Sequence, residues 1–413
     1  MQMTSSSGPA LESMAAGAGR YLTTRGLASG LKLGEDAILH AGVFADIGYD
    51  SNVFYSDNAQ AAPVLHVTPR LELTNAERDG SIPSGTYYNL NVSLDWREYL
   101  VGDSSIPNIQ AQNALNPSAG GTVEFSSGQA LSLSLADAFT RDQQAPYTNG
   151  SPITRDDNMA SASLRFAPGG GRLRVMLRYS NLIDNYEGST YARGSNMGNE
   201  GVLDIGWRWL PKTSIYVQVA QGAITYVNGG TGISSFPLRT LLGLRGLLTG
   251  KLAVNIAAGY SNAFYSSGGS PSGVGVVTEL NYNMSIFSQA GIGYHHDFAN
   301  SPFVGQYYNM DAVYGAYRQM IAGRVVTYAY GRYENRRFVG SGPTNSRTYL
   351  SNSRTDNTII GGLSLDYMIG KFFLAGASYT LSLNRSSDTD QADATAGVDY
   401  AKHVLLFRVG VVY

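Results

Sequence analysis

The chain has 413 residues, of which 15% are charged and 43% are hydrophobic, and its mean hydropathy is −0.13. It contains no cysteine, which excludes disulfides and thiolate metal sites, and its formal net charge of −2 gives no basic signal for nucleic acid. Soluble proteins usually carry about 25% charged residues. The runs of roughly 20 apolar residues that a membrane-spanning helix needs do not occur, since even Leu238–Leu248 is broken by Arg239 and Arg245. This combination is typical of a transmembrane β-barrel, in which apolar outward and polar inward residues alternate.

The first part of the chain shows no such alternation. Leu11, Met14, Ala15 and Ala18 give only a weak helical stripe, flanked by glycine and serine. We expect residues 1–36 to form a leader. Its composition favours disorder on the periplasmic side, and the alternative is a short helix that enters and partly plugs the barrel.

From residue 37 to residue 413, eighteen segments alternate between apolar and polar residues with the period of a β-strand. They predict an all-β fold, a transmembrane antiparallel β-barrel of 18 strands over residues 37–413. The predicted strands are Ala37–Tyr49, Leu65–Asn75, Thr86–Glu98, Gly121–Phe125, Ala130–Thr140, Asn158–Phe166, Leu173–Glu187, Asn199–Trp209, Ser214–Val227, Leu238–Leu248, Leu252–Tyr265, Val274–Met284, Gln289–Asp297, Tyr307–Arg318, Arg324–Arg336, Asn357–Met368, Lys371–Arg385 and Asp399–Tyr413.

The connections between these strands alternate in length. Short ones such as Leu210–Thr213 and Ser285–Ser288 are followed by long polar ones such as Tyr99–Gly120 and Phe338–Asp356. Barrels of this kind have short turns on the periplasmic side and longer loops on the extracellular side. A soluble sandwich or propeller has no reason to sort its loops in this way. An even strand number also places both ends of the barrel on the short-turn side.

Charged side chains fix the phase of several strands. In Leu173–Glu187 the apolar side chains alternate with Arg174 and Arg178, and an arginine in the middle of a bilayer would cost about 2–4 kcal/mol. Tyr328 and Tyr330 are placed inside by similar reasoning. The charged side chains that we expect to line the lumen are Asp95, Arg97, Arg174, Arg178, Arg208, Arg239, Arg245, Glu279, Asp297, Asp366 and Arg408.

Two motifs open the predicted barrel. Gly30–Gly34 reads G-L-K-L-G, and Gly48–Phe54 reads G-Y-D-S-N-V-F at the end of the first strand. Together they resemble the opening of outer-membrane barrels of the beta-barrel porin 2 family. The resemblance implies a location in the outer membrane of a Gram-negative bacterium and a link to exopolysaccharide export. It also implies two partners, a periplasmic polysaccharide-export protein and a polysaccharide cargo.

The second motif can also be read from its residues alone. Asp50 and Asn52 are good turn formers, because their side chains bond nearby backbone N–H groups. Tyr49, Phe54 and Tyr55 would lie at the membrane interface, where aromatic rings keep one edge in water. A turn at the end of a strand with an aromatic girdle therefore accounts for the motif without a binding role.

The last predicted strand carries an apolar face, on which Phe407 and Tyr413 point towards lipid, while Arg408 points inward. A strand that ends on an aromatic residue resembles the final strand of outer-membrane barrels, which carries the signal read by the barrel-insertion machinery. Closure requires this strand to pair with Ala37–Tyr49. Such a barrel would contact outer-membrane lipid and lipopolysaccharide.

The sequence offers no constellation for catalysis. His295 and His296 are adjacent, so on a strand their rings point to opposite faces and cannot share a metal. Asp388, Asp390 and Asp393 lack the glycine and closing glutamate of an EF-hand loop, which leaves a solvated acidic loop, in reach of divalent ions held by lipopolysaccharide. We expect no enzyme activity, no metal site and no cofactor.

Three functions remain open. The first is a conduit that exports a polysaccharide with a periplasmic partner, because tyrosine rings and guanidinium groups suit a sugar path. The second is a general diffusion porin, which predicts a loop folded inward as a constriction, with Tyr99–Gly120 as the candidate. The third is a structural or adhesion barrel of a surface or motility complex. For any single inward charge, bracing of the barrel wall is the simpler role.

Overall fold

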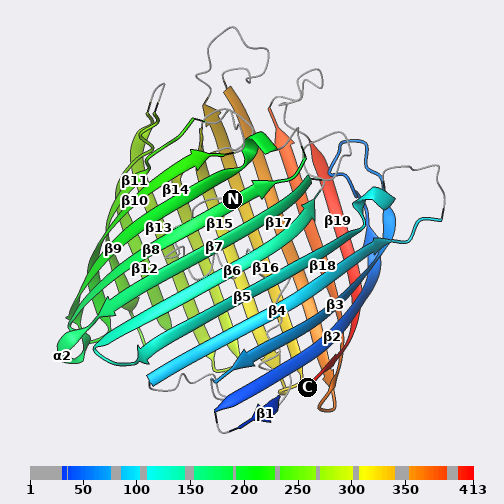
Figure 1. The fold of residues 1–413 in the computed structure, drawn as a ribbon, viewed down its shortest axis with the longest axis horizontal. Helices are drawn as coiled ribbons and strands as arrows, with labels where there is room; N and C mark the ends of the chain where they lie inside the picture. Colours follow the sequence, from blue (N-terminus) through cyan, green and yellow to red (C-terminus); the bar gives the residue numbers. More distant parts are fainter. Residues whose placement is uncertain are drawn as a thin grey trace.

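A computed structural model describes residues 30–34, 36–75, 85–102, 109–144, 153–188, 192–227, 233–266, 270–300, 307–339, 353–387 and 399–413. These residues form a single antiparallel sheet of 19 strands. Each strand from β2 to β18 pairs with the next one along the chain, and β19 pairs with β2. The sheet is therefore a closed barrel of tilted strands (Figure 1), with the 18-strand ring that the sequence predicts.

The bounds of the strands agree with the predicted ones to within a few residues at most ends. The strands of the ring are β2 (Ala37–Asp50), β3 (Ala62–Thr74), β4 (Gly85–Tyr99), β5 (Ala114–Ser127), β6 (Leu131–Gln144), β7 (Ile153–Phe166), β8 (Leu173–Tyr186), β9 (Asn196–Leu210), β10 (Thr213–Tyr226), β11 (Leu238–Leu247), β12 (Leu252–Asn262), β13 (Ser272–Ser285), β14 (Ser288–Asn300), β15 (Tyr307–Ile321), β16 (Val325–Val339), β17 (Ser353–Ile369), β18 (Phe373–Ser386) and β19 (Tyr400–Val412). In the described part of the chain, three short helical turns accompany them, η2 (Gln110–Gln112), α2 (Pro168–Gly171) and η3 (Ala192–Gly194). Within the described ranges, no helix has the length and hydrophobicity to cross a membrane.

Two segments differ from the expected strands. The fourth strand of the barrel, β5, starts at Ala114 rather than at Gly121, because Asn116 and Ser118 continue its inward face while Pro117 interrupts the apolar one. An additional strand, β1 (Leu31–Leu33), lies in the segment that we expected to be part of the leader. The rest of that leader, residues 1–29 and 35, lies outside the described residues.

Strand β1 extends the strand pairing at the seam of the barrel, which is the place where β19 pairs with β2. It pairs with the first residues of β2, with Leu33 opposite Ala37 and Leu31 opposite Leu39. On the same edge of β2, β19 pairs only as far as Gly42, and Tyr413 exchanges two backbone hydrogen bonds with Ala41. The G-L-K-L-G motif thus covers backbone groups of β2 that β19 leaves without a partner.

Side chains alternate between the two faces of the barrel wall. In β9, the outward Leu203, Ile205 and Trp207 are 38%, 42% and 50% exposed, whereas the inward Asp204 between them is 0% exposed. The same alternation in β19 exposes Phe407 and leaves Arg408 on the inner side. Because apolar side chains at the outer surface are favourable only against hydrocarbon, the exterior is that of a membrane-spanning barrel.

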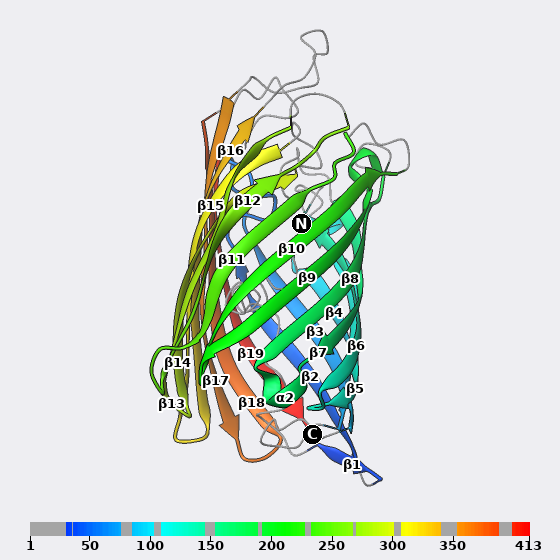
Figure 2. The same cartoon turned by 90° about the vertical axis from the view of Figure 1, so that its left-hand side faces the viewer.

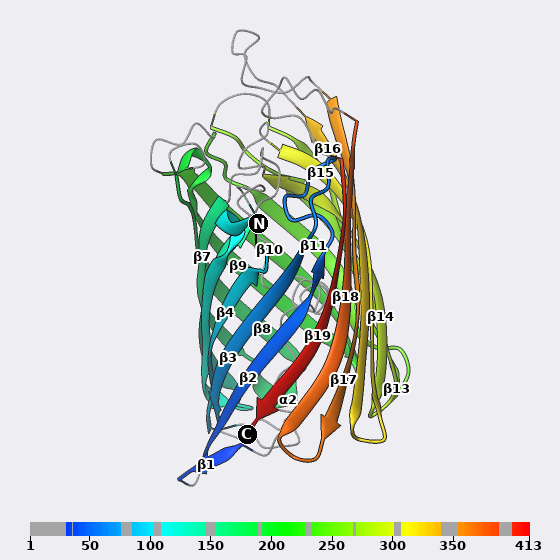
Figure 3. The same cartoon turned by 90° about the vertical axis from the view of Figure 1, so that its right-hand side faces the viewer.

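The two ends of the barrel differ as the sequence predicts. Connections 128–130, 211–212 and 286–287 lie at one end, whereas the long connections 51–61, 340–352 and 387–399 join strands at the other. Figures 2 and 3 show the chain end after β19 and α2 together at the short-turn end. Connection 75–84 is the long exception at the short-turn end.

The Y-D-S-N-V-F motif ties the seam together at the long-loop end. Asn52 is 0% exposed, and its side-chain amide donates to the backbone oxygens of Ser56 (2.7 Å) and Ala401 (3.1 Å). Tyr49 points outward as predicted. The prediction for the other two aromatics is wrong, because Phe54 is buried in a cluster with Ile109 and the Tyr55 ring contacts Tyr400, with centroids 5.2 Å apart.

Candidate functional site: the inward wall of the barrel

The inward face of the barrel is the candidate site because ionised side chains gather there in pairs. Within the described ranges, no group of three or more histidine, aspartate or glutamate residues is arranged to hold a metal ion. The acidic loop with Asp388, Asp390 and Asp393 lies outside the described residues. What the wall offers is therefore a surface of paired charges and aromatic rings.

The first cluster is centred on Asp204 in β9. Arg245 reaches its carboxylate from β11, two strands away, with nitrogen–oxygen distances of 2.5 and 3.0 Å. Arg174 in β8 approaches the same carboxylate at 3.5 Å. On the way, the Arg245 guanidinium lies 4.2 Å from the centre of the Tyr216 ring and passes over Gly206. Arg245 therefore lies flat along the wall rather than projecting from it.

A second cluster lies on β8 to β14. Arg239 in β11 forms an ion pair with Asp297 in β14, and His295 Nε2 lies 3.8 Å from the same carboxylate. Arg178 Nη2 is 3.7 Å from Glu200 Oε1, and both side chains are almost completely buried. Because both signs of charge occur in each group, the wall has a polar surface without a large excess of either sign.

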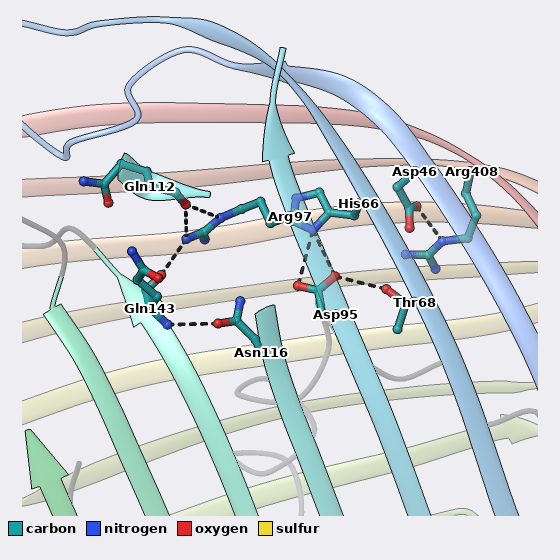
Figure 4. A network of polar contacts seen from close by, with 9 residues as sticks. All are labelled: Asp46, His66, Thr68, Asp95, Arg97, Gln112, Asn116, Gln143 and Arg408. Atoms are coloured by element: carbon teal, nitrogen blue, oxygen red, sulfur yellow. Dashed lines mark hydrogen bonds and ion pairs between the residues drawn. The ribbon is translucent and has the colours of Figure 1, made fainter. Parts of the chain in front are cut away.

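The wall formed by β19, β2, β3 and β4 carries a third group (Figure 4). Arg408 Nε donates to Asp46 across the seam at 2.6 Å. Asp95 accepts from Thr68 at 3.0 Å and lies 3.1 Å from His66 Nδ1. These contacts join neighbouring strands on the inner side of the wall, and the expected bracing role of such pairs stays a prediction.

Two of the predicted lumen residues lie at the ends of the barrel. Arg97 at the end of β4 donates to the backbone oxygens of Gln112 (3.0 Å) and Gln143 (2.6 Å) (Figure 4). It thereby holds the turn η2, which precedes β5, against the inner wall. Arg208 in β9 donates to the backbone oxygen of Gly170 at 2.8 Å, in the short turn between β7 and β8.

The two remaining predicted residues are buried acids. Glu279 in β13 is 4% exposed and accepts from the Tyr314 hydroxyl at 3.4 Å. Asp366 in β17 is 3% exposed and faces Gly376 in β18. The Tyr314 ring in turn covers Gly293, where a Cβ atom would overlap it. Large inward side chains thus lie across glycines of the neighbouring strand.

Sequence reasoning missed the acids that hold the predicted arginines. Asp46, Glu200 and Asp204 share the inward phase of their strands, so phase alone could have found them. It also missed Glu334 in β16, whose two carboxylate oxygens accept from Nε of Arg332 and of Arg336 on the same strand, both at 2.7 Å. Tyr328 and Tyr330, which were predicted to point inward, share the phase of Glu334 in β16, and the centres of their rings are 5.9 Å apart.

Comparisons with known proteins return structures but no family. No family model matches the chain, and no curated protein matches it. The beta-barrel porin 2 resemblance is therefore not confirmed. Similar solved structures include OccAB3 from Acinetobacter baumannii, which is 12% identical with a TM-score of 0.46 over 92% of this chain and 99% of that chain.

Two further structures are similar to a comparable degree. The outer membrane protein opdK from Pseudomonas aeruginosa is 10% identical, with a TM-score of 0.45 over 91% of this chain and 99% of that chain. The siderophore receptor PirA from Pseudomonas aeruginosa is 6% identical, with a TM-score of 0.44 over 91% of this chain and 80% of that chain. Similarity at this level concerns barrel architecture and assigns no cargo.

Proposed function

We propose that this protein is a non-enzymatic diffusion channel for small hydrophilic solutes in the outer membrane of a Gram-negative bacterium. Barrels of 16–18 strands are wide enough to hold an aqueous channel. The inward wall carries paired charges of both signs, and several of its large side chains lie flat. A wall of this kind is wetted by water and compatible with polar solutes.

The observation that carries the proposal is the loop segment packed on the inner wall. Ile109, which is 0% exposed, packs in one cluster with Val64 and Tyr99, both on inward positions of their strands. Arg97 donates to the backbone oxygen of Gln112, three residues after Ile109 along the chain. A diffusion porin was expected to fold the connection between the third and fourth strands of the barrel inward, and the packing of Ile109 and Gln112 in that connection supports this expectation.

Polysaccharide export is the second candidate, and its support is the resemblance of the opening motifs. Burial of Asn52 and its bonds to Ser56 and Ala401 give the second motif a purely structural role at the seam. A periplasmic export protein and a polysaccharide cargo therefore remain proposals that rest on the resemblance. An anchoring barrel for a surface complex is the third candidate.

Conductance measurements separate these candidates. Purified full-length protein in a planar lipid bilayer is expected to give stable, stepwise conductance in potassium chloride without any partner. Absence of steps from protein that is folded, as shown by heat-dependent mobility on gels, would contradict the diffusion channel. Loss of secreted polysaccharide on deletion of the gene, restored by the wild-type chain, would instead support export.

A further inference from the structure

A polar cluster lies on the outer surface of the barrel, where β14, β15 and β16 approach the long-loop end. It consists of Tyr294, His296, Asp311 and Arg337, and we call it the outer cluster. Its members share the outward face of their strands with Ile292, Val313 and Tyr333, which are 55%, 44% and 42% exposed. Four polar side chains, one of them an arginine, are unfavourable against hydrocarbon. They therefore need polar groups of the membrane at this position on the outer face.

Asp311 organises the cluster. Its carboxylate accepts from the Tyr294 hydroxyl at 2.7 Å and lies 2.7 Å from His296 Nδ1. Arg337 Nη2 forms an ion pair with the other carboxylate oxygen. The Arg337 side chain is nevertheless 54% exposed, whereas that of Asp311 is 25% exposed. The acid thus fixes one edge of the guanidinium group and leaves more than half of the side-chain surface accessible.

The cluster lies near the long-loop end of the apolar surface. Next to it, the Tyr333 hydroxyl and the Asn335 amide both donate to Asn357, at 2.7 and 2.9 Å, on the same outward face. Further down β17, that face carries Ile359 and Leu363, which are 42% and 57% exposed. The outer cluster therefore lies where hydrocarbon gives way to lipid headgroups, on the side of the long loops.

Another outward-facing arginine provides a comparison. Arg141 at the end of β6 is held between two acids, Asp156 at 3.1 Å and Glu187 at 2.7 Å. Its side chain is 34% exposed, and its surroundings are acidic. In the outer cluster a single acid faces one arginine and one histidine. The two sites therefore differ in charge, although both lie on the outer face near the long-loop end.

We propose that the outer cluster binds a phosphate group of an anionic glycolipid in the outer leaflet, with Arg337 as the principal contact. Guanidinium groups bind phosphate bidentately, and the fork of Arg337 is held in place by Asp311. The imidazole of His296 bonds the other oxygen of the Asp311 carboxylate through Nδ1, so its Nε2 is a second donor to the phosphate when the ring is protonated. The proposal concerns the outer surface, so it does not depend on what passes through the barrel.

The test uses purified full-length protein in neutral detergent with a diphosphorylated glycolipid and its dephosphorylated counterpart. Bound lipid is counted by native mass spectrometry. We expect the wild type to prefer the phosphorylated lipid by about tenfold, which corresponds to about 1.4 kcal/mol. Arg337→Ala should abolish the preference, and Arg337→Lys should restore part of it. Arg141→Ala, the matched control, should leave it unchanged.

Several outcomes would overturn the proposal. One is equal retention of the two lipids by the wild type. Another is an equal loss of preference in the Arg337→Ala and Arg141→Ala variants. Displacement of the lipid by equimolar inorganic phosphate would indicate a site for a free anion. A wild-type dimer that Arg337→Ala converts to a monomer, without any lipid preference, would assign the cluster to contact between two copies. Heat-dependent mobility on gels verifies that each variant is folded.

Discussion

At the scale of single residues, Asp204 is the acid that neutralises two inward arginines on the wall formed by β8 to β11. It is 0% exposed and pairs with Arg245 and Arg174. We predict that Asp204→Asn shifts the ion selectivity of the channel towards anions, because both arginines lose their counter-charge. A unit charge about 4 Å from an ion contributes about 1 kcal/mol in water, so the permeability ratio should change by a factor of roughly two to five. The reversal potential in a salt gradient measures this ratio.

Asp137→Asn is the matched control for Asp204→Asn. Asp137 lies in β6 on the outward face, in phase with the exposed Leu133 and Leu135. It contacts Asn158 at 3.2 Å. The substitution removes the same charge from the other side of the wall, so the reversal potential should stay at the wild-type value. Equal shifts in both variants would show that the effect is not specific to the inward wall.

The predicted site residues show what sequence can and cannot reveal at this scale. Alternation gives the face of a side chain, and this is why Arg245 and Asp297 could be named from the sequence. It does not give their partners. Arg245 meets Asp204 across an intervening strand, and Arg239 meets Asp297 across two. Those pairs depend on the tilt and stagger of the strands, and the alternation of apolar and polar residues along a strand gives no information about either.

At the scale of elements, closure of the barrel depends on the seam between β19 and β2. The Tyr413 backbone exchanges hydrogen bonds of 2.8 and 3.3 Å with Ala41. Its ring stacks on Phe372, with centroids 5.6 Å apart and planes 3° apart. Deletion of Tyr413 removes all of these contacts, which together are worth about 2–4 kcal/mol. We predict a reduced amount of assembled barrel in the membrane, measured by heat-dependent mobility on gels.

The variant Tyr282→Ala tests whether the effect is specific to the seam or follows from the loss of any outward aromatic side chain. Tyr282 lies near the short-turn end of β13, faces outward, and is 44% exposed, close to the 48% of Tyr413. This variant should assemble as the wild type does. If the chain without Tyr413 accumulates normally in the membrane, the importance assigned to this seam is wrong.

The elements themselves could be predicted almost completely, because every strand of the ring faces two different solvents and must alternate. The failures occur where that signal is weak. Pro117 and the small polar residues around it hid the first half of β5. Leu31–Leu33 is too short to show a period, so β1 emerged only from its pairing with β2. Phe54 and Tyr55 belong to a loop, where no periodicity indicates the side on which an aromatic ring packs.

At the scale of the whole molecule, function depends on which end of the barrel faces the outside of the cell. Short connections lie at one end, together with the chain end after β19 (Figures 1 and 2), and apart from 75–84 the long ones join strands at the other. Both the proposed channel and the proposed lipid site assume that the long connections are extracellular. The chain contains no cysteine, so a single introduced cysteine reports its own position without background.

We predict that Ala59→Cys, in the connection between β2 and β3, reacts with a membrane-impermeant maleimide on intact cells. Ala59 is exposed and lies at the long-loop end. Gly250→Cys, in the turn between β11 and β12, has open space around its new side chain. Because it lies at the opposite end, it should react only after the cells are lysed, and a reagent small enough to cross the barrel should label both. Labelling of Gly250→Cys but not of Ala59→Cys on intact cells would reverse the orientation, and the outer cluster would then face the inner leaflet.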